Sequence, residues 1–199
     1  NEFGYTYLYN NQISEAEQEF KQAIQLDSTV ANFHNSLAAL YLETKRYLDA
    51  EQPVRTAIKL DSTFVNAYIN LAHVFNASNR YLEAERTIKL ALQLDSSQAI
   101  SYYHLAVSYV KTNRAVDAEN VVLKLVQRIP SAESYYYLAR IQSIMSQIDK
   151  SFESLEKSLK IEASYYEYIV EDPELVPLRA RTEQWKALMK KYFPDKVKD

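Results

Sequence analysis

Residues 63–96 read TFVNAYINLAHVFNASNRYLEAERTIKLALQLDS, and this stretch is one copy of a unit that the chain repeats about five times. Leu37, Leu71 and Leu105 recur at one constant spacing, and an alanine follows each of the three leucines. A self-similarity at a period of roughly 20 to 50 residues indicates stacked supersecondary units. The same spacing aligns further columns of similar residues: Tyr41, Phe75 and Tyr109; Ala50, Ala84 and Ala118; Val54, Ile88 and Val122.

The two outer copies are less regular. The first copy holds Phe3, Gly4 and Tyr7 in the leading columns. The fifth copy starts one residue early at Leu138, keeps Leu155, and has Ser151 and Ser158 in its alanine columns.

Each copy predicts two amphipathic helices. Apolar residues recur at i, i+3, i+4 and i+7, which is the spacing of one helix face. Two helices approach closely only where their side chains are short, so Ala72 and Ala84 are expected to mark the crossing. In the third copy the two stripes are Tyr68, Leu71, Ala72 and Phe75, and then Tyr81, Ala84, Ile88 and Ala91.

The turn between the paired helices requires a residue that tolerates a positive φ, yet the chain contains a single glycine. Asparagine is the commonest substitute for glycine in that conformation. Lys45 and Ser146 suit it less well and predict looser turns. The turn column reads Asn11, Lys45, Asn79, Asn113 and Ser146.

The linkers between copies repeat Leu-Asp-Ser at 26–28, 60–62 and 94–96, and then read Ile-Pro-Ser at 129–131. Asp and Ser are expected to accept hydrogen bonds from the first N–H groups of the next helix, and Pro130 blocks helix continuation. Pro53 falls inside a predicted helix, so we expect a kink there or a helix that starts late.

Composition excludes several classes of protein. The net charge is −3, without the basic stripe of a nucleic-acid-binding protein. The absence of cysteine excludes disulfides, thiolate nucleophiles and Cys-ligated zinc. There is no apolar run long enough to cross a bilayer and no signal peptide, so no membrane insertion is expected.

Residues 162–199 differ from the repeats. Pro173 and Pro177 divide the first part into short turns, and a last helix is expected from about 182 to 192. Trp185 and Leu188 belong to its apolar face, which can cover the final repeat. The lysines on and after this helix predict a solvated face and tail.

These columns resemble the tetratricopeptide repeat, with copies at about 1–28, 29–62, 63–96, 97–130 and 131–161. The chain departs from the family in two columns. The tryptophan that is usual near the start of the first helix is replaced by His34, Tyr68, Tyr102 and Tyr135, and the proline that usually closes a repeat appears only as Pro130. The resemblance implies an all-α, right-handed α-solenoid of about five antiparallel helix pairs with a C-terminal capping helix. It also implies that the first helix of each pair lines a concave groove.

The groove is the predicted site for a protein or peptide partner. Asparagine amides can pair with the backbone of an extended peptide, and tyrosine gives large contact area at a small entropic cost. In the alternative interpretation the asparagines only solvate an open surface and the tyrosines pack between neighbouring repeats. The predicted groove residues are Asn32, Asn35, Asn66, Ile69, Asn70, His73, Asn76, Tyr103, His104, Tyr136, Tyr137 and Arg140.

Other kinds of site are not expected. His34 falls in the packing column, while His73 and His104 lie on or beside the groove; none has a second metal-type ligand at helical spacing, so no metal site is predicted. There is no Gly-rich phosphate loop and no nucleophile elbow, and therefore no cofactor or catalytic residue is predicted. The outer acidic residues Glu15, Glu17, Glu19, Glu83 and Glu85 are interpreted as solvated.

The sequence therefore favours a non-enzymatic interaction scaffold. Family members that grip acidic chaperone tails use Lys, Asn and Arg on successive first helices, and the basic residues are missing here, so a carboxylate clamp is not expected. The chain begins without Met inside a repeat, which suggests a fragment of a longer, bacterial-type protein. The rival hypothesis is accordingly an accessory C-terminal array of a larger hydrolase, protease or kinase. Self-association through an uncapped first helix is a third hypothesis. The compartment is not fixed, with the cytoplasm slightly favoured over the periplasm.

Overall fold

The computed structural model describes residues 12–163 and 166–196, and within them the regular structure is helical, with no strand. The chain forms two compact units, Asn1–His104 and Leu105–Asp199, and each is described by itself. The first helix predicted for the first copy, with Phe3, Gly4, Tyr7 and the turn residue Asn11, lies outside the described residues.

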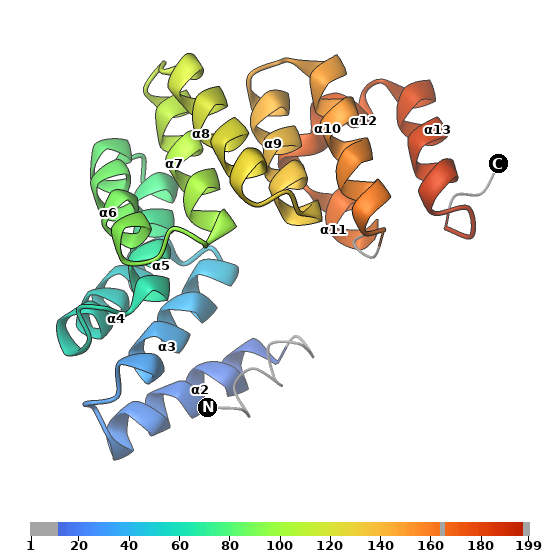
Figure 1. Cartoon of the computed structure of the whole chain (residues 1–199). Helices are drawn as coiled ribbons and strands as arrows, with labels where there is room; N and C mark the ends of the chain where they lie inside the picture. The colour runs from blue at the N-terminus through green and yellow to red at the C-terminus, as the bar shows by residue number, and fades with distance from the viewer. Residues whose placement is uncertain (1–11, 164–165, 197–199) are drawn as a thin grey trace. The chain divides into compact units, whose positions relative to one another are not determined.

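The N-terminal unit consists of consecutive helices that pack on one another in chain order (Figure 1). From α2 to α6 each helix contacts the next one, and α3 also lies beside α5. The all-α class and the two-helix unit predicted from the sequence are confirmed. The helices are α2 (Ile13–Leu26), α3 (Ala31–Glu43), α4 (Tyr47–Leu60), α5 (Val65–Ala77) and α6 (Tyr81–Leu94), followed by α7 (Ala99–Lys111), which begins in this unit and ends in the second.

The C-terminal unit continues the pattern and then departs from it. Helix α9 packs on both α8 and α10, and the short helices after α10 return to the last pair, with η1 on α9 and α12 on both α10 and α13. The predicted last helix is confirmed as α13. The elements are α8 (Ala115–Arg128), α9 (Ala132–Ile144), α10 (Ile148–Ile161), α11 (Tyr166–Glu171), the 3₁₀ helix η1 (Pro173–Leu175), α12 (Val176–Arg179) and α13 (Thr182–Tyr192).

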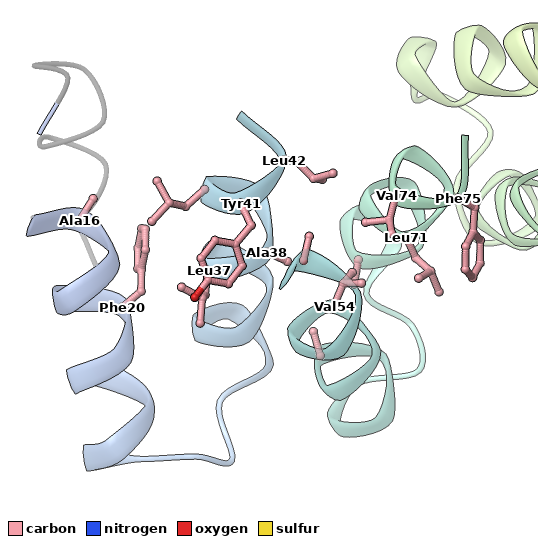
Figure 2. Close-up of a cluster of buried hydrophobic side chains, with 14 of the residues drawn as sticks. Ala16, Phe20, Leu37, Ala38, Tyr41, Leu42, Val54, Leu71, Val74 and Phe75 are labelled. Carbon is pink, nitrogen blue, oxygen red and sulfur yellow. The ribbon is translucent and has the colours of Figure 1, made fainter. Parts of the chain in front are cut away.

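The helices cross at the alanine columns. Ala38, Ala50, Ala72 and Ala84 are completely buried, and larger apolar side chains fill the space beside them. Figure 2 shows this cluster, in which Phe20 of α2 points toward Leu37 and Tyr41 of α3. Short side chains at the crossing therefore allow close helix approach, as the sequence predicts.

The fifth copy replaces two of these alanines by serine without leaving a polar group unsatisfied. Ser151 Oγ donates to the carbonyl of Ala139 at 2.6 Å, and Ser158 Oγ donates to the carbonyl of Ala132 at 2.7 Å. Both serines are buried. A hydroxyl is small enough for the crossing and finds an acceptor on the facing helix, so the burial of serine there carries no unmet hydrogen bond.

The turns within the pairs share one geometry. Lys45, Asn79, Asn113 and Ser146 have φ values of 59°, 60°, 59° and 59°. The N–H of the following residue returns to a carbonyl at the end of the preceding helix, as from Arg46 to Tyr41 at 2.7 Å, which is the closure of a Schellman motif. The expectation of looser turns at Lys45 and Ser146 is wrong, because this shared backbone closure holds the left-handed conformation at each of them.

In the linkers, the aspartate binds the linker itself and does not cap the next helix as predicted. Asp27, Asp61 and Asp95 end the preceding helices, and their carboxylates accept the N–H and the hydroxyl of the residue two positions later, at 2.6–2.9 Å. Helices α3 and α5 have no side-chain N-cap, so the predicted capping is wrong there. Ser131 does cap α9, accepting from Ser134 N at 3.2 Å.

Side chains in the column that replaces the family tryptophan form hydrogen bonds to backbone carbonyls of the same linkers. Tyr68 OH donates to the carbonyl of Ser62 at 3.0 Å, and Tyr102 OH donates to the carbonyl of Ser96 at 3.1 Å. His34 Nε2 lies 2.9 Å from the carbonyl of Ser28 and makes the equivalent bond. His34 is therefore a structural residue, as its place in the packing column predicts.

Pro53 does not shorten its helix. Helix α4 begins at Tyr47, the position equivalent to Tyr81 at the start of α6, and runs through Pro53 to Leu60. The expectation of a late start is therefore wrong. Proline lacks the N–H that would bond to the carbonyl of Asp49, and packing of Ala50, Val54 and Ala57, all buried, supports the helix on both sides of it.

The crossing can be tested by enlarging one alanine. Ala84→Leu inserts a bulky side chain at a completely buried position, so we expect the free energy of unfolding to fall by about 1–3 kcal/mol in urea titration. Ala115→Leu, at an exposed position of α8, is the matched control and should change it by less than about 0.5 kcal/mol. Equal losses for the two variants would contradict close packing at Ala84.

Candidate partner-binding groove

The twelve predicted groove residues come from α3, α5, α7 and α9, and the structure separates them by exposure. Asn32 and Asn66 are exposed, and Asn70, His73, Tyr136 and Arg140 are half-buried. The other six are buried: Asn35, Ile69, Asn76, Tyr103, His104 and Tyr137. Only part of the predicted set is therefore accessible to a partner.

In the N-terminal unit the buried members contact the neighbouring pair. Asn70 Nδ2 donates to Asn35 Oδ1 at 2.9 Å, which joins α5 to α3. Asn76 Nδ2 donates to the carbonyl of His104 at 3.0 Å, which joins α5 to α7. A buried amide without a partner would cost free energy, so these asparagines satisfy one another and the backbone between repeats.

Two histidines meet at the same face. The rings of His73 and His104 lie with their centroids 5.0 Å apart at an interplanar angle of 32°. Tyr47 of α4 lies 6.2 Å from the His73 ring, and Tyr103 lies 5.4 Å from the His104 ring. The structure thus brings both predicted groove histidines together in an aromatic cluster between α5 and α7.

The segment that follows α10 packs back on the α9–α10 pair. Asp172, at the start of η1, accepts a hydrogen bond from Tyr136 OH at 2.5 Å, and its carboxylate lies 3.0 Å from Arg140 Nε. The Glu174 carboxylate lies 2.7 Å from the same nitrogen, and Ser143 Oγ donates to the Glu174 carbonyl at 2.6 Å. Tyr136, Arg140 and Ser143 are spaced i, i+4 and i+7, so one stripe of α9 holds the segment.

This contact is buried and anchored by apolar residues. The Asp172 side chain is only 4% exposed, and Leu175 and Leu178 are completely buried. Burial and the hydrogen bond to Asp172 raise the pKa of the Tyr136 phenol, which therefore stays a neutral donor. The segment from Asp172 to Leu178 is an integral part of the last pair's core.

A further set of contacts was missed by the sequence analysis. Glu17 of α2 binds Arg46 in the next pair's turn and accepts from Tyr41 OH at 2.9 Å, and its side chain is only 17% exposed. The interpretation of Glu17 as solvated is therefore wrong, and it is equally wrong for Glu85, whose side chain is 13% exposed and pairs with Lys89. One repeat after Glu17, Glu51 lies 2.7 Å from Arg80, whose guanidinium stands 4.3 Å from the centroid of the Phe75 ring.

The signal for these ion pairs is in the sequence period. Glu17 and Glu51 lie one repeat period apart, as do Arg46 and Arg80. Burial opposes ionisation of Glu17, but hydrogen bonds from Lys21, Arg46 and Tyr41 outweigh it and lower its pKa from 4.5 to about 2. The pair stabilises the contact between neighbouring repeats.

The described part of the chain was compared with the requirements of a metal site and of a membrane-spanning helix. Residues 12–163 and 166–196 contain no group of three or more His, Cys, Asp or Glu side chains able to hold a metal ion. None of the helices in these ranges combines the length and the apolar character needed to cross a membrane.

Comparison with protein families agrees with the architecture. Two family models, both described as tetratricopeptide repeat, match residues 1–63, and residues 65–98 and 132–165. The matched ranges together cover well over half of the chain. No curated protein sequence matches this one.

Solved structures with the same fold share little sequence with this chain. A thermophilic tetratricopeptide repeat protein of Thermus thermophilus has 16% identity and a TM-score of 0.73, over 94% of this chain and 96% of its own. A tetratricopeptide repeat protein of Parabacteroides merdae has 16% identity and a TM-score of 0.72, and the match covers 90% of this chain and 68% of that protein. YrrB, a tetratricopeptide repeat protein with an unusual peptide-binding site, has 17% identity and a TM-score of 0.54. The match covers 88% of this chain and 93% of YrrB.

The Glu17 contacts predict a pH dependence. Because the folded pKa of Glu17 is lower than its unfolded value, its stabilisation is complete above about pH 4.5 and is lost as the pH falls toward 2. Glu17→Gln should lower the free energy of unfolding at pH 7 by about 1–3 kcal/mol. In urea titrations the gap between the native chain and the variant should narrow from pH 5 to pH 3. A gap independent of pH would contradict the assignment.

The anchoring of the C-terminal segment can be tested at Arg140. Arg140→Ala leaves the buried Asp172 carboxylate without its cation, so we expect the free energy of unfolding to fall by about 3–5 kcal/mol. Lys150→Ala is the control, because Lys150 pairs with Glu119 at an exposed position, and it should cost less than about 1 kcal/mol. Similar small losses in both variants would show that Asp172 is not held by Arg140.

Proposed function

We propose that this chain, which belongs to the tetratricopeptide repeat family, is a non-enzymatic scaffold that binds a peptide or helix of a partner protein. The proposed surface is the groove lined by the first helices of neighbouring pairs, α3 and α5. The family's fold generally serves protein interaction. The finer assignment rests on the side chains that these helices leave accessible.

The observation that carries the proposal is a polar, accessible row on neighbouring helices. Asn32 and Asn66 are exposed and occupy equivalent positions in successive repeats. Helix α3 lies beside α5, and this supports the assignment of the two amides to one surface. A primary amide donates and accepts hydrogen bonds, and can pair with the main chain of an extended segment. The half-buried Asn70 and His73 extend this row on α5.

The proposed surface is smaller than the sequence suggests. Tyr136 and Arg140 hold the chain's own C-terminal segment, and the burial of Leu175 and Leu178 makes displacement of that segment costly. We therefore restrict the proposed surface to the N-terminal unit, where no comparable segment covers α3 and α5 among the described residues.

The chemistry of the row favours a neutral or main-chain contact. The accessible side chains on α3 and α5 that carry the proposal are amides and one imidazole, without lysine or arginine. An acidic segment of a partner would therefore have no basic side chain to pair with on this row. The fold is compatible with such a role, since one structural neighbour, YrrB, has a peptide-binding site.

The groove is tested by affinity capture from the source cell's lysate. The double variant Asn32→Arg with Asn66→Arg places two bulky charges in the row, at exposed positions that leave the core unchanged, and should abolish capture of the partner. The matched control Gln52→Arg with Gln93→Arg introduces the same charge on α4 and α6, also at exposed positions, and should retain it. Circular dichroism would establish that all three proteins are folded.

Each outcome has a distinct meaning. Loss in the first variant alone supports the groove and identifies its partner. Loss in the control alone moves the binding surface to the second helices. Equal capture by all three proteins contradicts a partner site on α3 and α5.

A further inference from the structure

A second concave surface lies in the C-terminal unit, between α10 and the last helix, α13. It encloses about 450 Å³ and is open to solvent. One wall is formed by Asp149, Glu153 and Glu156 of α10, and the other by Gln184, Ala187 and Lys191 of α13. Phe152 and Leu188 form the floor, and both are nearly buried. The groove is thus bounded by two helices with an apolar floor.

The charges on the two walls are not balanced. Asp149, Glu153 and Glu156 are spaced i, i+4 and i+7 and therefore share one face of α10. Glu156 is paired with Lys191 at 2.6 Å and lies 3.8 Å from Lys160. Asp149 and Glu153 are exposed and form no ion pair with any residue that the structure describes.

The helix itself gives these two carboxylates only small stabilising roles. Asp149 lies in the first turn of α10, where a negative charge is favourable. Glu153 lies beyond that turn, where it repels Asp149 at i−4 and attracts Lys157 at i+4, each by only about 0.2–0.5 kcal/mol. A cation placed in the groove would offset this repulsion.

The shape of the groove selects the kind of cationic ligand. The exposed methyl group of Ala187 leaves room for a side chain on the α13 wall, beside the remaining surface of Phe152. Grooves between two helices accept the apolar face of a third helix, whose anchors recur at i, i+3 and i+4. Lysine or arginine on the flank of such a helix would meet Asp149 and Glu153.

We propose that the α10–α13 groove docks a basic amphipathic helix of a partner protein. An apolar side chain contacts Ala187 and Phe152, and two basic side chains one helical turn apart pair with Asp149 and Glu153. This site is separate from the surface proposed on α3 and α5, and the two can be tested independently.

The test uses the full chain and a designed, fluorescently labelled helical peptide that carries lysines at i and i+4 beside a leucine face. Fluorescence anisotropy measures its affinity, and the same peptide with glutamine in place of lysine is the reference. Asp149→Asn with Glu153→Gln should weaken binding of the lysine peptide about tenfold, because two charge-assisted contacts are lost. It should leave the glutamine peptide unaffected.

Two further variants keep the test decisive. Glu15→Gln with Glu19→Gln removes two carboxylates at the same i, i+4 spacing from α2, outside this groove, and should change the affinity less than about twofold. Ala187→Arg fills the groove with a positive side chain and should abolish binding. Equal weakening in the α2 and α10 variants, or no effect of Ala187→Arg, would overturn the proposal.

Discussion

The close approach of two helices at buried alanines is the constraint on which the rest of this structure depends. Ala72 and Ala84 are completely buried and leave no room for a larger side chain between their helices. Once the backbones are this near, the turn between them must be tight, which requires a positive φ at Asn79. The larger apolar side chains can then pack only on either side of the crossing. Serine satisfies the same constraint in α10, because its hydroxyl bonds to the facing helix.

Polar contacts add to the apolar core where neighbouring pairs meet. The amides of Asn35 and Asn70 bind each other, and the Glu17–Arg46 pair connects one pair to the turn of the next. In a repeat array each unit depends mainly on its neighbours, and the Glu–Arg contact recurs one repeat later as Glu51–Arg80. In the α9–α10 pair, the Asp172 turn makes the equivalent polar contacts, to Tyr136 and Arg140 of α9.

The surfaces left for partners follow from these contacts. The polar side chains between neighbouring pairs bind one another or the backbone. Helices α3 and α5 therefore present only a narrow row of polar side chains to a partner, in which Asn32 and Asn66 are exposed. The C-terminal segment covers one stripe of α9 but creates a groove with α10, where Asp149 and Glu153 remain without basic partners among the described residues. The proposed functions therefore assign a neutral surface to the first unit and an acidic one to the second.

The sequence by itself determined the helices, their pairing and the crossings, because the repeat period records a constraint that recurs in every copy. It also located α13 from its apolar stripe. Tertiary structure decided which polar residues face solvent: Asn35 and Asn66 look alike in sequence, but one is buried against Asn70 and the other is exposed. The period identifies equivalent positions in successive repeats, whereas burial depends on what the neighbouring pair, or the Asp172 turn, presents to each of them.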